Sequence, residues 1–143
     1  GFINYLGTTS DVLPIIREAD CMVLPSYREG ISRVLMEAAS MEKPIIATNV
    51  TGCREVINDG ETGFLCKVKS PVDLAHKMAK IINMTEKEKV VMGQKGRVKV
   101  IEEMDLEKII DIYDYKIAAV LGEEEGITVD LQELISLRKT KKI

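Results

Sequence analysis

Several features that mark particular protein classes are scarce or missing in this 143-residue chain. It has no tryptophan and one histidine, and no apolar run approaches the roughly 20 residues that cross a bilayer. The 20 basic and 23 acidic residues give a net charge of −3, without the cationic excess typical of nucleic-acid-binding domains. The sequence therefore predicts neither a membrane-spanning helix nor a nucleic-acid partner.

Cysteine and histidine are too few for several kinds of site. Cys21, Cys53 and Cys66 are an odd number with wide spacing, which suits neither a disulfide framework nor a four-ligand zinc site. We interpret them as reduced apolar core residues of a cytoplasmic protein, with Cys53 as the one loop thiol that could react. The single histidine, His76, falls in a predicted helix away from the candidate site below, so we assign it no catalytic role.

The residues that are present form the pattern of an α/β protein. Hydrophobic residues make up 45% and charged residues 30%, in a chain of single-domain length. The strand candidates are residues 2–6, 21–24, 44–48 and 63–68. The helical segments between them are residues 10–19, 32–42 and 53–57. This alternation predicts a parallel sheet with flanking helices.

Beyond Pro71 the sequence is helical and has no strand signal. A predicted helix at 71–83 carries an apolar stripe that we expect to be buried, formed by Val72, Ala75, Met78, Ala79 and Ile82. Further helices are predicted to start at 85–88 and to span 105–121. We take residues 1–121 as one domain, and 122–143 as a polar and basic tail with a short helix.

The segment with the most chemical information is 24–39. After the strand 21–24, a loop with Glu29 leads to Gly30 and Ser32, which open a helix. In an open α/β sheet, ligands bind beyond the carboxyl ends of the strands, and a helix start there favours a pyrophosphate. We expect the carboxylates of Glu29 and Glu37 to reach one common cavity and to hold different parts of an elongated ligand. The spacing alone fits better a solvated ion pair between Arg33 and Glu37.

The same segment resembles a known family. A loop glutamate followed after seven residues by a second glutamate, with Lys43-Pro44-Ile45-Ile46-Ala47-Thr48 downstream, is similar to the donor-binding lobe of retaining glycosyltransferases of family 4. The resemblance covers about 2–121. The amino-acid sequence at 26–30 and 52–56 is most similar to that of bacterial enzymes that build capsule, exopolysaccharide or lipid-linked glycans, typically from UDP-sugars. The fold implied is the carboxy-terminal lobe of a GT-B enzyme, a partial Rossmann-like parallel sheet with a helical C-terminal segment.

The resemblance implies a role for each matching position. Glu29 would be the catalytic residue and hydrogen-bond the donor sugar, while Glu37 would bind the ribose hydroxyls and Leu6 would lie near the base. The donor-binding residues would be Gly7, Thr8, Gly30, Ile31, Ser32, Arg33, Val34 and Glu37. The implied reaction is retaining transfer of a hexosyl or N-acetylhexosaminyl group, with no cofactor and no tightly held metal.

Two positions depart from the family, which usually has proline where Ser32 stands and glycine where Glu42 stands. Ser32 is a good N-cap residue, so we still expect the helix to begin there. The start of the chain looks like the middle of a longer gene product. In the resemblance, the acceptor lobe and two strand-helix units with the diphosphate-binding Arg and Lys would lie outside it, so we expect the isolated chain to be inactive.

The missing units would leave the sheet incomplete. Either strand 2–6 pairs directly with strand 21–24, or an edge is left for another chain to cover, as in an oligomer. The expected location is the cytoplasm, free or against the inner face of the membrane, where the basic tail could touch lipid. Two alternatives remain open: a nucleotide-binding or interaction module without catalysis, and a nucleotide-sugar epimerase.

Overall fold

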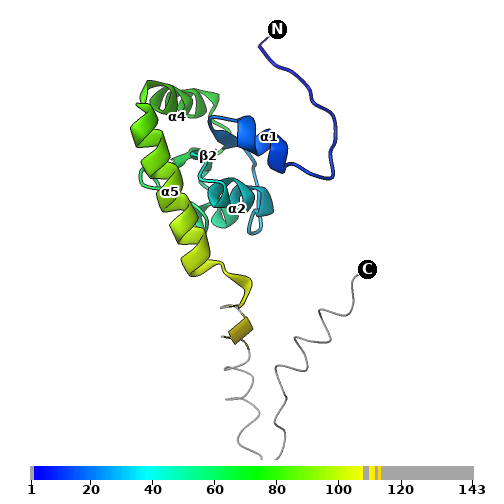
Figure 1. Cartoon of the computed structure of the whole chain (residues 1–143). Coiled ribbons are helices and arrows are strands. Elements are labelled where there is room, and N and C mark those ends of the chain that lie inside the picture. The colour runs from blue at the N-terminus through cyan, green and yellow to red at the C-terminus, as the bar shows by residue number, and fades with distance from the viewer. Residues whose placement is uncertain (1, 108–109, 112, 114–143) are drawn as a thin grey trace, which may run out of the picture. The chain divides into compact units, whose positions relative to one another are not determined.

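The computed structural model describes residues 2–107, 110–111 and 113. The chain divides into two units, Gly1–Asp105 and Leu106–Ile143, and the following account concerns the first (Figure 1). Its elements are α1 (Leu13–Glu18), β1 (Met22–Leu24), α2 (Arg33–Ser40), β2 (Ile45–Thr48), α3 (Thr51–Arg54), β3 (Phe64–Cys66), α4 (Pro71–Asn83) and α5 (Glu86–Glu103). Most of the predicted helix 105–121, and all of the tail 122–143, lie outside the described residues.

The three strands form one parallel sheet in the order β1-β2-β3. Val23 pairs with Ile46, and Ala47 pairs with Leu65, so β2 has a partner on both sides. All four residues of β2 are buried, as expected of a parallel strand covered on both faces. The prediction of a parallel α/β fold from the alternation of strands and helices is confirmed.

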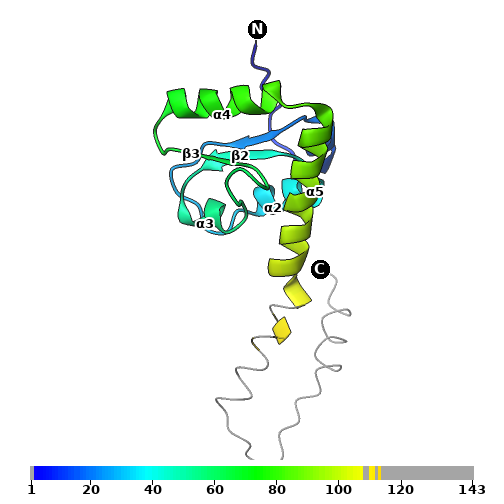
Figure 2. The same ribbon diagram turned by 90° about the vertical axis from the view of Figure 1, so that its left-hand side faces the viewer.

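Helices cover both faces of this sheet. In Figure 2, α4 lies along one face and α2 and α3 lie against the other. The larger buried cluster, on the α2 side, includes Leu35, Ala38 and Val56, and the smaller one joins Ile46 to Ile81 of α4 and Met92 of α5. The long helix α5 contacts α2 as well, so it connects the two sides of the sheet.

The predicted strand 2–6 is wrong. These residues have no regular structure and are exposed, and Figure 1 shows the segment running clear of the sheet. A strand gains its hydrogen bonds only from a neighbouring strand, and within the described residues β1 is paired on the β2 side alone. Of the two outcomes expected for this edge, the described residues therefore show the unpaired one.

The expected burial of the apolar stripe on α4 is also wrong. Val72 is 67% and Ile82 73% exposed, and Ala75, Met78 and Ala79 are exposed as well. The helix instead turns Leu74 and Ile81 toward the sheet, where they join Val23, Ile46 and Phe64. Leu74 and Ile81 are seven residues apart and so lie on one face of the helix, and this face, in place of the predicted stripe, packs over the strands.

The end of α2 shows why one family departure matters structurally. Glu42 has a φ of +58°, the left-handed conformation that ends many helices and that favours glycine. The amide N–H of Lys43 donates to the carbonyl of Ala38 at 3.0 Å, which closes the helix. Gly93 of α5 packs on this turn so closely that a Cβ there would lie 1.8 Å from the Glu42 carbonyl oxygen.

Candidate functional site

The loops that follow β1 and β2 meet at the carboxyl edge of the sheet. The hydroxyl of Thr48, at the end of β2, donates to the backbone carbonyl of Ser26 in the loop after β1. Together the two loops enclose an open cavity of about 640 Å³. It is lined by Tyr27, Arg28, Glu29, Gly30, Asn49, Val50, Thr51 and Arg54. The structure thus places Glu29 and Gly30 in one cavity where the sheet topology predicts a ligand site.

A close backbone contact fixes one wall of this cavity against the other. Gly52, at the start of α3, lies against the loop, and a Cβ at this position would be 1.6 Å from the Gly30 carbonyl oxygen and 2.8 Å from that of Glu29. Only glycine fits without a shift of backbone. The position of the Glu29 loop therefore depends on α3, a dependence that the sequence analysis did not identify.

Arg54, the last residue of α3, extends along the same wall. Its Nη1 donates to Asn49 Oδ1 at 3.1 Å and its Nη2 donates to Thr51 Oγ1 at 3.3 Å. These two bonds restrain the guanidinium group at the cavity, beside the loop that carries Glu29.

Glu37 lies elsewhere. It is on α2, where its Oε1 accepts a hydrogen bond from Arg33 Nε at 2.9 Å, and its side chain is 23% exposed against 86% for Arg33. It lines a separate cavity of about 410 Å³ between α1 and α2. The ion pair expected from the spacing is formed, and the cavity that Glu37 lines is not the one that Glu29 lines.

The structure separates these two carboxylates because they leave different sides of the helix start. Glu29 precedes α2 in a loop directed toward α3, while Glu37 is the fifth residue of the helix and lines the cavity toward α1. The two glutamates thus line two different cavities, and a common ligand for both stays a prediction. Any ligand that reaches both groups has to extend along the start of α2.

The other predicted donor-binding residues fall into three settings. Gly7 and Thr8 are exposed in the segment before α1, with Leu6, and line none of the cavities described here. Ser32 is buried and is the N-cap residue of α2, so the helix begins there as expected, although the Ser32 hydroxyl makes no capping hydrogen bond. Ile31 is exposed, whereas Val34 packs against the larger core cluster.

The cysteines belong to the core. Cys53 and Cys66 are fully buried, and burial raises the pKa of the Cys53 thiol, with the Glu29 charge adding to the rise. Burial likewise raises the pKa of Cys66, and it raises that of Cys21 to about 11, with the Asp20 charge as a further cause. Raised pKa values keep the thiols protonated and unreactive, so Cys53 is not the reactive loop thiol that the sequence left open.

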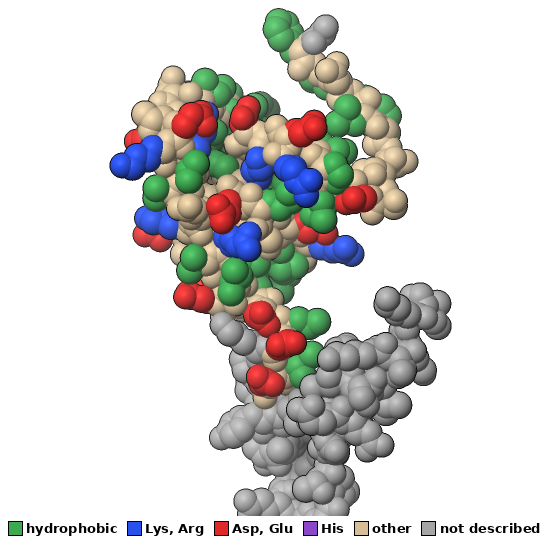
Figure 3. Space-filling view, viewed as in Figure 1, with side chains coloured by type: hydrophobic (Ala, Val, Ile, Leu, Met, Phe, Trp, Pro, Cys, Tyr) green, Lys and Arg blue, Asp and Glu red, His purple; other side chains and the backbone are tan. Residues whose placement is uncertain are grey.

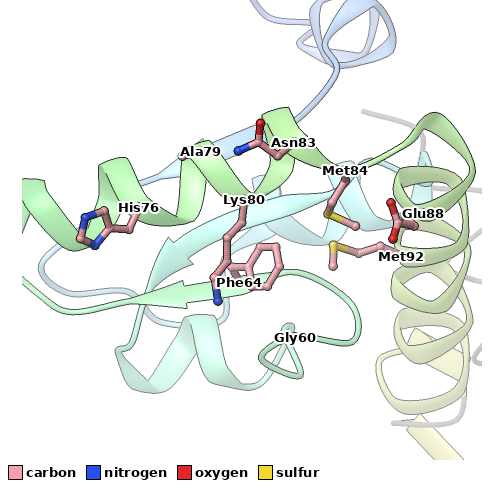
Figure 4. Close-up of a pocket in the computed structure, with 9 residues that line it drawn as sticks. All are labelled: Gly60, Phe64, His76, Ala79, Lys80, Asn83, Met84, Glu88 and Met92. Carbon is pink, nitrogen blue, oxygen red and sulfur yellow. The ribbon is translucent and has the colours of Figure 1, made fainter.

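A third cavity, of about 500 Å³, lies between α4, α5 and the start of β3 (Figure 4). His76 lines it together with Phe64, whose ring has Lys80 Nζ 5.4 Å from its centroid. The histidine thus lies on the α4 side of the sheet and does not line the cavity of Glu29.

Acidic and basic side chains are interspersed over most of the face seen in Figure 3, and those at the lower end of its coloured part are acidic. Among the described residues, no group of three or more His, Cys, Asp or Glu is arranged to hold a metal ion. In the same part of the chain, none of the helices has the length and hydrophobicity needed to cross a membrane.

Comparison with known proteins assigns the fold to a family. The sequence profile described as Glycosyl transferases group 1 matches residues 2–99, more than half of the chain. The chain belongs to the group 1 glycosyl transferases. The matched region contains both cavity-forming loops and the contact between Gly52 and Gly30, so the site described above lies within the family domain.

Curated relatives of this group 1 domain include two bacterial enzymes. It is 32% identical over 117 residues to the capsular polysaccharide biosynthesis glycosyltransferase CapM of Staphylococcus aureus, covering 82% of this chain and 30% of the relative. It is 32% identical over 124 residues to N-acetyl-alpha-D-glucosaminyl L-malate synthase of Bacillus anthracis, covering 87% of this chain and 32% of that enzyme. The chain thus spans about a third of the length of these relatives.

Solved structures share the fold. A glycosyltransferase from Rickettsia africae superposes with a TM-score of 0.70 at 27% identity, over 77% of this chain and 31% of that one. Anabaena HepE in complex with UDP gives a TM-score of 0.74 at 22% identity, over 80% of this chain and 31% of that one, which shows the fold alone. The prediction of a glycosyltransferase domain from the residues at 26–56 is confirmed.

Proposed function

We propose that this group 1 domain binds the donor in an enzyme that transfers a sugar from a UDP-sugar to a glycan or lipid-linked acceptor, with retention. The observation that carries the proposal is the placement of Glu29 and Gly30 in an open cavity at the carboxyl edge of the sheet. The family match supports transfer chemistry, and the structures of Anabaena HepE with UDP and with UDP-glucose support a uridine nucleotide as the probe.

Glu29 is the proposed catalytic residue. Its carboxylate accepts hydrogen bonds from hydroxyl groups, and the Gly30 backbone beside it gives the sugar close access. Glu37, on the α1 side of α2, is the proposed ribose-binding residue and would be reached by the far end of the donor. The leaving diphosphate needs electrostatic stabilisation, which basic side chains and backbone N–H groups supply without a metal.

The acceptor class is proposed from the relatives. CapM is a capsular polysaccharide enzyme, and a transferase from Campylobacter jejuni, 34% identical over 82 residues, is named for a diphospho-undecaprenol acceptor. The transferred group is a hexosyl or N-acetylhexosaminyl unit. We further propose that the 143-residue chain alone does not catalyse transfer, because it spans about a third of its relatives.

The test uses the full gene product and a panel of radiolabelled UDP-hexoses and UDP-N-acetylhexosamines. We expect labelled product with one of them, and NMR of the product to show the anomeric configuration of the donor. The change Glu29→Gln keeps the side-chain shape but removes the charge. We expect about a 10- to 100-fold loss of kcat/KM, since a hydrogen bond to a charged group contributes about 1.5–3 kcal/mol.

A matched control is Glu61→Gln, an exposed glutamate in the turn before β3, which we expect to leave the rate unchanged. Nucleotide binding without transfer or donor hydrolysis would favour the non-catalytic module, and interconversion of two UDP-sugars would favour the epimerase. A product with the opposite anomeric configuration to the donor would contradict the proposed retention and leave the proposed sugar transfer intact.

A further inference from the structure

Arg54 is one of three arginines of the first unit, with Arg17 and Arg28, for which the described residues provide no carboxylate within ion-pairing distance. Arg33 pairs with the carboxylate of Glu37, and Arg97 lies 3.9 Å from that of Glu42. The two groups that accept hydrogen bonds from Arg54 are neutral oxygens, of Asn49 and Thr51. No carboxylate in the described part of the chain lies within ion-pairing distance of Arg54, so its positive charge is not compensated there.

The same two hydrogen bonds hold the guanidinium group in one orientation and leave other N–H donors of the group available to a ligand. A guanidinium group has five N–H donors, and two of them are used by Asn49 and Thr51. The other three have no hydrogen-bond partner among the described residues. Since the side-chain entropy has already been reduced by these bonds, less is lost when a ligand binds.

The position of Arg54 is also fixed relative to Glu29. Arg54 is two residues from Gly52, whose contact with the Gly30 carbonyl permits no Cβ. A ligand group near Glu29 therefore meets a guanidinium group held on the neighbouring wall of the same cavity. Arg28 lines this cavity as well, so two cationic side chains and one carboxylate are placed around it.

We propose that Arg54 binds a phosphate group of a substrate in the cavity lined by Glu29. A planar guanidinium group with free N–H donors binds phosphate oxygens through charge-assisted, bidentate hydrogen bonds. The inference rests on the proposed function, in which this cavity receives substrates. The phosphate belongs either to the nucleotide donor or to a lipid-linked acceptor, and both sources present the same chemistry to Arg54.

The test compares Arg54→Gln and Arg54→Lys in the full gene product. Gln is able to hydrogen-bond Asn49 or Thr51 without a charge, whereas Lys keeps the charge without the planar fork. Lys95→Ala, an exposed change on α5, is the control for the general loss of a surface cation. Thermal unfolding of each variant reports whether Arg54 only stabilises the loop.

Two dissociation constants and one kinetic constant separate the possible outcomes: the Kd for UDP, the Kd for inorganic pyrophosphate, and the KM for the acceptor. If Arg54 binds the donor phosphate, Arg54→Gln raises the Kd for UDP about ten-fold or more, with a smaller effect for Arg54→Lys. If it binds the acceptor phosphate, the KM for the acceptor rises by a similar factor while the Kd for UDP is unchanged. Either result supports the proposal, provided that the melting temperature is unaltered.

The proposal is overturned if Arg54→Gln changes none of the three quantities by more than two-fold, or if Lys95→Ala changes them equally. If Arg54→Gln weakens binding only as far as it lowers the melting temperature, Arg54 has a structural role, and this result also overturns the proposal. Failure of the wild-type protein to bind UDP would count against the proposed function, while binding of pyrophosphate that depends on Arg54 would still support this inference.

Discussion

The contact between α5 and the end of α2 makes a sharp stability prediction possible. Gly93 and Gly96 lie three residues apart on α5, and both are buried. A Cβ at Gly93 would be 1.8 Å from the backbone oxygen of Glu42, whereas at Gly96 the nearest atom, the carbonyl oxygen of Thr62, would be 3.6 Å away. The two alanine variants therefore gain the same helix propensity but differ in steric cost.

The expected magnitudes follow from these distances. Alanine in place of glycine within a helix contributes about 0.5–1 kcal/mol. At Gly96 the new methyl group makes an ordinary contact, so we expect Gly96→Ala to be stabilising by about that amount. At Gly93 the nearest atoms all belong to the backbone of Glu42, so no side chain can move aside and α5 has to shift away from α2. Overpacking of this kind costs about 1–3 kcal/mol or more.

Urea unfolding of the chain, followed by far-UV circular dichroism, measures the difference between the variants. We expect Gly93→Ala to be less stable than Gly96→Ala by about 2 kcal/mol or more, which corresponds to roughly 8 °C in melting temperature for a unit of this size. Equal stability of the two variants would show that α5 does not approach Glu42 closely, and the described packing of α5 on α2 would be wrong.

Three other predictions follow from the described residues. Glu42→Gly relieves a left-handed conformation and should raise the free energy of unfolding by about 1 kcal/mol, and a loss of stability in urea would contradict this. Thr85→Ala removes the capping box with Glu88 at the start of α5 and should cost about 1 kcal/mol, with faster amide exchange in the first turn of α5; unchanged exchange would argue against the cap. Because the folded state raises the pKa of the thiols, it binds more protons than the unfolded state between about pH 9 and the raised value near 11 of Cys21. Stability should therefore fall as pH rises through this window, and thiol labelling of the folded chain at pH 8 should be slow until urea unfolds it; a rise in stability over the same window would refute the assignment.

Much of the fold could be predicted because it depends on local signals. Helix α4 begins and ends at the predicted residues, since Ser70 caps it and Pro71 occupies its first turn. The central strand was visible as an apolar run after Pro44. The family-like residues from Glu29 to Gly52 were sufficient to identify a glycosyltransferase domain.

The errors arose where long-range contacts decide the outcome. Residues 2–6 have the alternation of a strand, but a strand forms only when another strand pairs with it. Helical periodicity shows that α4 has apolar residues, yet the sheet beneath decides whether Val72 or Leu74 is buried. The spacing of Glu29 and Glu37 does not reveal that they line different cavities, nor does it show that Gly52 supports the first of them.

The parallel order of the sheet has a consequence for synthesis of the protein on the ribosome. Val23 has to wait for Ile46 before the first strand pair can form, and Glu42 has to wait for Gly93 before α5 closes over α2. During this interval the apolar side chains of β2 have no complete cover, and such nascent segments are the ones that aggregate or recruit chaperones. This interval ends only when the chain through residue 103 is available, because α5 contacts α2 and its Met92 completes the cluster that covers Ile46 of β2.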